Sequence, residues 1–196
     1  MAKPLSGRRL VKALRKEGVT VTGYRSWRRH HRNSKGAWGP VHGVMLHHTA
    51  TSGREASVRV CYEGRADLPG PLCHGVIDRD GVVHMVGNGR TNHAGLGDAN
   101  VLQAVIAERS LPPVNDASVD GNARFYGFEC INRGDGEQEW PAAQLDAMVR
   151  VAAAICRAHH WTAPSVIGHV EWQPGKVDPR GVGMASLRSK IAARLS

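Results

Sequence analysis

The spacing of apolar residues along the chain predicts an alternation of helices and short strands. Helical spacing recurs in five segments, residues 6–17, 56–65, 99–109, 141–160 and 184–195. The clearest is 141–160, which begins with Pro141 and repeats apolar residues such as Leu145, Met148 and Ile155 on one face. The first is followed at once by Gly18, a typical helix stop.

Short apolar runs between these helices predict the strands, at residues 19–22, 41–48, 72–78, 82–86, 125–131 and 165–167. Asp80-Gly81 lies between two of the runs and suits a tight hairpin turn. Helices and strands that alternate in this way indicate an α/β fold with a central mixed β-sheet flanked by helices. We divide the chain into a basic helix and loop segment, residues 1–40, that packs on or leads into a second unit, residues 41–196.

A length of 196 residues with 41% hydrophobic content fits one core of ordinary size. No stretch approaches the length of a membrane span, and the start of the chain lacks the apolar centre of a secretory signal. We therefore expect a cytoplasmic product. The four cysteines are widely spaced, which favours reduced thiols in the core over disulfides or a zinc ribbon.

Positive charge is concentrated at the N-terminus. Residues 1–35 contain 11 of the 26 lysines and arginines, and Glu17 is their one acidic residue, so the rest of the chain is close to neutral. Such asymmetry suggests an anionic partner, which the composition leaves open among nucleic acid, a lipid surface and a cell-wall polymer. A solvated helix face that only aids solubility would have the same composition.

Three residues are candidates for a metal site. His47 and His169 each follow an apolar strand, and Asp178 lies shortly after the second of them. Two histidines and an aspartate are ligands suited to a catalytic zinc that keeps one position open, which indicates a hydrolase. Lys176 would place a cation beside the metal, where negative charge develops on a substrate oxygen. Glu129 is the one acid in an apolar strand, so it needs a partner or a chemical role.

Together, four motifs resemble a known family. In order they are His47-His48-Thr49-Ala50, Asn92-His93-Ala94-Gly95, Gly127-Phe128-Glu129, and the stretch from Gly168-His169 to Asp178-Pro179. Their order and types are similar to those of the zinc-dependent N-acetylmuramoyl-L-alanine amidases, the superfamily of phage endolysins, muropeptide-recycling amidases and peptidoglycan recognition proteins. The resemblance begins near Val41 and reaches the C-terminus, and its last motif looks most like endolysins of actinobacterial phages or prophages.

The resemblance implies a role for each matched residue. His47, His169 and Asp178 would bind Zn²⁺, Glu129 would be the catalytic acid and base, and Lys176 would stabilise the oxyanion. The expected substrate-binding residues are Asn92, His93, Thr49 and Trp172. Several phage members carry a tyrosine just before a histidine on the next strand, whereas this chain reads Leu72-Cys73-His74. We therefore expect Glu129 to carry more of the proton transfer.

The implied fold is that of the peptidoglycan recognition proteins, with zinc in a groove. The implied activity is hydrolysis of the amide between the lactyl group of N-acetylmuramic acid and L-alanine in peptidoglycan. We expect a monomeric, antimicrobial endolysin of a bacteriophage that is made without a signal peptide and causes cytolysis after release, with a holin as one route. Residues 1–35 would contact an anionic wall or membrane surface, and no nucleic acid is expected. The alternatives are a cytosolic recycling amidase and a non-catalytic peptidoglycan-binding module.

Overall fold

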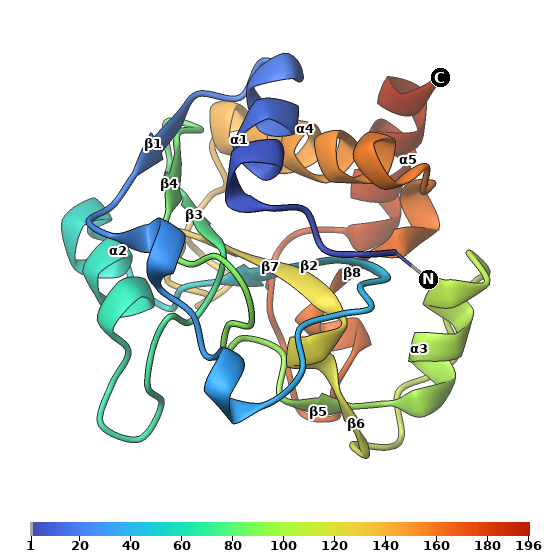
Figure 1. Ribbon diagram of the computed structural model, residues 1–196. Coiled ribbons are helices and arrows are strands. Elements are labelled where there is room, and N and C mark those ends of the chain that lie inside the picture. Colours follow the sequence, from blue (N-terminus) through green and yellow to red (C-terminus); the bar gives the residue numbers. More distant parts are fainter. Residues whose placement is uncertain (1) are drawn as a thin grey trace.

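The computed structural model describes residues 2–196 and has a six-stranded mixed sheet at its centre (Figure 1). Its strands in chain order are β1 (Val21–Gly23), β2 (Gly43–His48), β3 (Gly75–Ile77), β4 (Val83–Met85), β7 (Phe125–Cys130) and β8 (Val166–Gly168). They lie side by side in the order β1-β4-β3-β7-β2-β8, and the β3–β4 pair alone is antiparallel. A separate two-stranded sheet pairs β5 (Leu96–Gly97) with β6 (Val119–Asp120).

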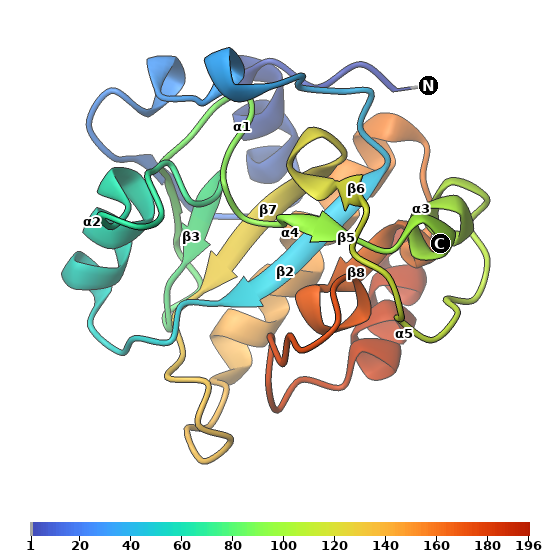
Figure 2. The ribbon, with the colours of Figure 1, turned by 90° about the horizontal axis from the view of Figure 1, so that it is seen from below.

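Helices cover both faces of the large sheet. They are α1 (Gly7–Lys16), α2 (Arg54–Glu63), α3 (Ala99–Ile106), α4 (Ala142–His159) and α5 (Met184–Leu195). The core on one face joins side chains of α1, α4 and α5 to the sheet, while α2 and α3 contribute to two smaller clusters on the other face. Figure 2 shows this division, with α4 behind the strands and the small β5–β6 sheet in front. Short 3-10 turns complete the chain at Trp27–Arg29, Asn33–Lys35, Gly121–Ala123, Ala163–Ser165 and His169–Glu171. The α/β class and the mixed central sheet expected from the sequence are confirmed.

Local sequence explains where several elements begin and end. Ser6 caps α1 because its hydroxyl accepts the N–H of Arg9 at 3.4 Å. The hairpin between β3 and β4 turns at Gly81, whose φ of 83° lies in the left-handed region that favours glycine. The two longest helices, α4 and α5, begin and end within a residue or two of the limits predicted from the spacing of apolar residues.

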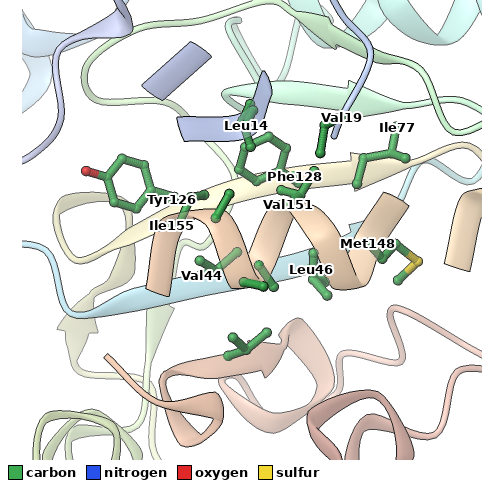
Figure 3. Close-up of a cluster of buried hydrophobic side chains, with 14 of the residues drawn as sticks. Leu14, Val19, Val44, Leu46, Ile77, Tyr126, Phe128, Met148, Val151 and Ile155 are labelled. Carbon is green, nitrogen blue, oxygen red and sulfur yellow. The ribbon is translucent and has the colours of Figure 1, made fainter. Parts of the chain in front are cut away.

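Side chains that alternate along the central strands place the large core on one face of the sheet and the candidate site residues on the other. In β2, Val44 and Leu46 pack into the large core against α4 (Figure 3), whereas Met45 belongs to the smaller cluster on the opposite face. Successive side chains of a strand point to opposite faces, so His47 shares the face of Met45. Because β2 and β7 run parallel with His47 opposite Glu129, these two residues lie side by side on that face.

The N-terminal residues are part of the same packed fold. Strand β1 is an edge strand of the central sheet, and Leu10, Val11 and Leu14 of α1 lie in the large core. All four cysteines are buried as free thiols. Within residues 2–196, no helix combines the length and the apolar character that crossing a bilayer requires.

Candidate active site

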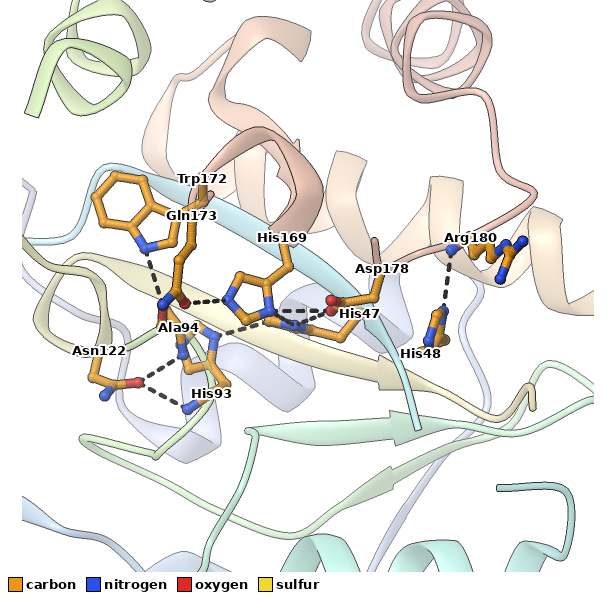
Figure 4. Close-up of polar contacts among 10 residues, drawn as sticks. All are labelled: His47, His48, His93, Ala94, Asn122, His169, Trp172, Gln173, Asp178 and Arg180. Carbon is orange, nitrogen blue, oxygen red and sulfur yellow. Dashed lines mark hydrogen bonds and ion pairs between the residues drawn. The ribbon is translucent and has the colours of Figure 1, made fainter. Parts of the chain in front are cut away.

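The three candidate ligands meet at the C-terminal ends of two neighbouring parallel strands. His47 is near the end of β2, His169 follows β8 directly, and Asp178 is in the loop after it. The Nδ1 atom of His47 lies 3.1 Å from Nδ1 of His169, and Oδ2 of Asp178 lies 2.9 Å and 3.1 Å from those two nitrogens (Figure 4). Residues 131 positions apart in the chain are thus brought into direct contact.

This cluster fits a zinc ion. Its donor set of two imidazole nitrogens and one carboxylate oxygen is suitable for a catalytic site with one position left for water or substrate. Ligand atoms about 2.0–2.1 Å from a tetrahedral zinc lie about 3.3 Å from each other, close to the separations seen here. His47 and His169 are buried, with 1% and 5% of their residue surface exposed, so the pair is shielded from competing water.

Local contacts hold each ligand. The turn that carries His169 is fixed by Glu171, whose carboxylate accepts the N–H of Gly168 at 3.0 Å and pairs with Arg188 at 2.8 Å. The N–H of Val170 donates to the carbonyl of Asp178 at 2.8 Å, which ties the loop of the third ligand back to the same turn. Hydrogen bonds of the backbone, as well as contacts of the side chains, therefore set the positions of His169 and Asp178.

His48, the neighbour of His47, has turned away from the cluster. Its Nδ1 accepts the backbone N–H of Arg180 at 3.0 Å (Figure 4), and its ring packs closely over Gly134. This is the consequence of alternation along β2, which sends adjacent side chains in opposite directions. Of the two adjacent histidines, only His47 is directed to His169 and Asp178.

The electrostatics of the cluster favour an anionic aspartate beside neutral histidine. Burial lowers the pKa of His47 to about 4, although Asp178 opposes this effect. Burial alone would raise the pKa of Asp178, but its contacts with His169 and His47 hold that pKa well below its usual range. Neutral imidazole and ionised carboxylate are the forms that bind a metal ion.

Glu129 lies next to this cluster. It is opposite His47 in the register of β2 and β7, and its Oε2 atom is buried with no hydrogen-bond partner among residues 2–196. Burial raises the pKa of Glu129 well above its usual value, nearby Asp178 adds to the increase, and Lys176 opposes it. A carboxyl group in this environment takes up a proton more readily than one in water.

The other predicted residues differ in their surroundings. Lys176 is exposed and makes no ion pair among the described residues, which leaves its ammonium group free. The hydroxyl of Thr49 bonds to Thr51 in the loop after β2 and to the backbone of Asn132 in the loop after β7. Asn92 is partly exposed, and its side chain donates to the carbonyl of Pro69 at 3.2 Å.

His93 and Trp172 are buried, at 7% and 0% exposure. The indole of Trp172 donates to the carbonyl of Ala94 at 3.0 Å and packs against Phe125 at a ring distance of 5.0 Å. With no exposed surface, Trp172 supports the site from behind, which does not agree with the substrate contact expected from the sequence. His93 contacts His47 directly, with their facing ring nitrogens 3.1 Å apart.

Sequence reasoning did not single out Gln173 and Asn122. Gln173 lies one turn after His169, and its Oε1 atom is 3.3 Å from Nε2 of that histidine. Asn122 accepts the backbone N–H groups of His93 and Ala94, each at 2.8 Å. The four-residue spacing of His169 and Gln173 was a usable signal, whereas nothing near Asn122 in the sequence points to the distant residues it holds.

The fold and the site together define an α/β protein with a candidate metal centre at the ends of parallel strands. The chain belongs to the N-acetylmuramoyl-L-alanine amidase family of enzymes, whose sequence model matches residues 37–181. No curated protein sequence matches the chain significantly.

Solved structures of similar fold include both endolysins and other amidases. The N-acetylmuramoyl-L-alanine amidase LysC from Clostridium intestinale URNW is 13% identical, with a TM-score of 0.59, and the match covers 88% of this chain and 97% of that one. A mutant endolysin from Bacillus subtilis is 18% identical, with a TM-score of 0.60 and coverage of 88% and 99%. AmpDh3 from Pseudomonas aeruginosa, solved with anhydromuramic pentapeptide, is 18% identical, with a TM-score of 0.58 and coverage of 83% and 64%. At these identities the likeness establishes the fold alone.

Proposed function

We propose that the protein is a zinc-dependent hydrolase that cleaves the amide between the lactyl group of N-acetylmuramic acid and L-alanine of the peptidoglycan stem peptide. Membership of the amidase family supports the reaction class. The observation that carries the proposal is the contact of two histidine nitrogens and one aspartate oxygen within 3.1 Å, beside the carboxyl group of Glu129, whose Oε2 atom is buried with no partner among residues 2–196.

His47, His169 and Asp178 are the residues that would hold the zinc ion. When bound, zinc polarises the amide carbonyl and makes water a better nucleophile at neutral pH. Asp178 contributes one negative charge against the two positive charges of a zinc ion, so the site would keep a net positive charge once the ion is present. That charge favours the anionic transition state of amide hydrolysis.

Glu129 is the residue that moves the proton. Its carboxylate accepts a proton from the attacking water, and its raised pKa lets it keep that proton until the leaving amine of L-alanine takes it up. The exposed ammonium group of Lys176 follows the metal-site turn by a few residues and would contact the oxyanion. Thr49 and Asn92, which border the strand end and the loop beside it, remain candidates for contacts with the stem peptide.

The assigned base is tested by replacing Glu129 with alanine. Glu129→Ala should retain zinc in elemental analysis and lose the ability to clear a suspension of purified cell walls. Glu137→Ala, at an exposed site away from the cluster, is the matched control and should retain both properties. Full wall clearing by Glu129→Ala would refute the assignment.

We favour an endolysin that acts on the intact cell wall after its release from the cytoplasm, with phage-driven cytolysis as the outcome. Support comes from the endolysins among the structures of similar fold and from the last sequence motif. The second candidate is an amidase for soluble muropeptides, which the likeness to a structure holding anhydromuramic pentapeptide supports. Turnover of intact sacculi compared with soluble anhydro-muropeptides separates the two, because a recycling enzyme should cleave only the soluble fragments well.

The basic N-terminal segment is the proposed contact with an anionic wall or membrane surface. Helix α1 packs its apolar side on the core, and its outward side carries five exposed cations without ion pairs among residues 2–196: Arg8, Arg9, Lys12, Arg15 and Lys16. The helix packs on the face of the sheet opposite to the face that carries His47, so it can touch a surface without blocking the site. We accordingly treat residues 1–40 as a charged face attached to the catalytic unit, residues 41–196.

Charge variants that keep the core test this contact. Replacing Arg8, Arg9 and Lys12 by glutamine should weaken binding to purified walls at low salt, because electrostatic attraction to a polyanion is screened by salt. The matched control replaces three exposed cations elsewhere, Arg59, Arg109 and Lys190. If both triple variants bind equally, the location of the contact is wrong.

A further inference from the structure

A chain of hydrogen bonds leads from the backbone of β7 through His93 to His47. The Nε2 atom of His93 lies 3.0 Å from the carbonyl oxygen of Phe125. Its Nδ1 atom lies 3.1 Å from Nε2 of His47, a contact drawn in Figure 4. His93 therefore contacts the ring edge of His47 that is opposite to Asp178. Its 7% exposure leaves little surface for a substrate.

The positions of the ring protons follow from these hydrogen bonds. A carbonyl oxygen can only accept a hydrogen bond, so Nε2 of His93 carries a proton and donates a hydrogen bond to the carbonyl of Phe125. In the neutral ring, Nδ1 of His93 is then an acceptor, and Nε2 of His47 must donate to it. That leaves the lone pair of His47 on Nδ1, the atom that faces Asp178 and His169.

The surroundings of the second histidine are compatible with the same arrangement. Nε2 of His169 lies 3.3 Å from Oε1 of Gln173, and a hydrogen bond donated to that oxygen would leave the lone pair of His169 on Nδ1. Two nitrogen lone pairs and a carboxylate oxygen then face each other at 2.9–3.1 Å. Such an arrangement suits a cation held between the three atoms.

The surrounding structure is built to keep His93 in place. Asn122 holds the backbone of His93 and Ala94 through two bonds of 2.8 Å, and Trp172 donates to the carbonyl of Ala94. Beneath the ring lies Gly127, where a Cβ atom would come within 2.4 Å of the imidazole. The glycine of the third sequence motif is thus explained by the close approach of His93 to the strand.

We infer that His93 is a positioning residue, which fixes His47 in the tautomer that presents Nδ1 to the metal and thereby strengthens zinc binding. The inference rests on the metal site of the proposed function and concerns a residue outside the ligand set. Residues that orient metal-bound histidines in this way typically contribute about 10–100-fold to metal affinity.

The tautomer is measured on metal-free wild-type protein by two-bond ¹⁵N–¹H correlation spectra of the histidine rings. His47 and His93 should each carry their proton on Nε2. A proton on Nδ1 of His47 would overturn the inference. Since the measurement needs no metal and no substrate, its result does not depend on whether the chain is an active amidase.

Variants at His93 supply the second readout, the zinc dissociation constant from competition with a chelator. His93→Phe keeps a flat ring over Gly127 and removes the acceptor, so zinc binding should weaken about 10–100-fold. His93→Gln can accept from His47 and donate to Phe125, and it should restore much of the affinity. His159→Phe is the control, because His159 bonds to Tyr126 on the far face of the sheet and should bind zinc like the wild type.

Thermal unfolding of the metal-free variants shows whether each is folded. If His93→Phe does not fold, the zinc affinity of His93→Gln and the tautomer spectra still test the role of His93. Equal zinc affinity in wild type and a folded His93→Phe would overturn the inference while leaving the amidase proposal intact. A wild-type protein that binds no zinc would instead contradict the proposed function.

Discussion

Replacing Glu129 by glutamine should remove the activity and at the same time stabilise the metal-free protein. The Oε2 atom of Glu129 is buried with no partner among residues 2–196, and burial raises the pKa of the carboxyl group above its ordinary value of 4.5. The folded state therefore binds this proton more tightly than the unfolded state. As a result, the stability of the wild type falls as pH rises from the unfolded pKa through the folded one.

The size of the effect follows from the cost of an unsatisfied polar group. Leaving a buried group without its hydrogen bond costs about 1–3 kcal/mol, and more if the group is charged. The carboxamide of Glu129→Gln carries no charge at any pH, so most of the charge-dependent part of this cost disappears. For a chain of this size, each kcal/mol corresponds to about 2–4 °C in Tm. Loss of the acid and base should lower kcat by about 10²–10⁴-fold.

The assay is thermal unfolding of metal-free wild type, Glu129→Gln and the exposed control Glu137→Gln at pH 4 and pH 8. The gain of Glu129→Gln over wild type should be large at pH 8 and small at pH 4, where the wild-type carboxyl group is protonated. The control should show no such pH-dependent gain. If Glu129→Gln is no more stable than wild type at pH 8, the carboxyl group is not held in the unfavourable environment described above.

Three further substitutions test the site. His169→Ala should lose bound zinc in elemental analysis, and unchanged zinc content would refute its role as a ligand. Lys176→Ala should lower kcat by about 10²–10³-fold, as removal of an oxyanion donor does, with zinc content preserved; a change in KM alone would instead indicate a substrate-binding role. Gly127→Ala places a Cβ atom 2.4 Å from the ring of His93, and this overpacking should lower the unfolding free energy by about 1–3 kcal/mol. The control Gly53→Ala, where the nearest atom is 3.9 Å from the new Cβ, should lower it much less.

Much of the fold could be predicted because its signals are local. The apolar period of α4 and the Asp80-Gly81 turn each depend on residues that are close in the chain. Strand order does not have such a signal: β1 joins the edge of the sheet parallel to β4, a pairing between residues about 60 positions apart. The two-residue strands β5 and β6 are too short for any periodicity to show.

The candidate site was predictable to the extent that its ligands have distinctive neighbours in the sequence. His47, His169 and Asp178 were identified from residue type and strand ends, and they meet in space. The surroundings of a side chain are decided by packing, which the motifs do not report. Trp172 and His93 were therefore expected at the substrate, although burial places the first behind the site and the second against His47.

The most direct test of the account is mass spectrometry of purified peptidoglycan after digestion, with and without a chelator. The protein should release stem peptides that begin with a free L-alanine amine and leave glycan strands with intact lactyl groups. Incubation with the chelator should abolish these products, and added zinc should restore them. Products cut at any other bond, or the same products at full yield from chelator-treated protein, would contradict a zinc-dependent N-acetylmuramoyl-L-alanine amidase.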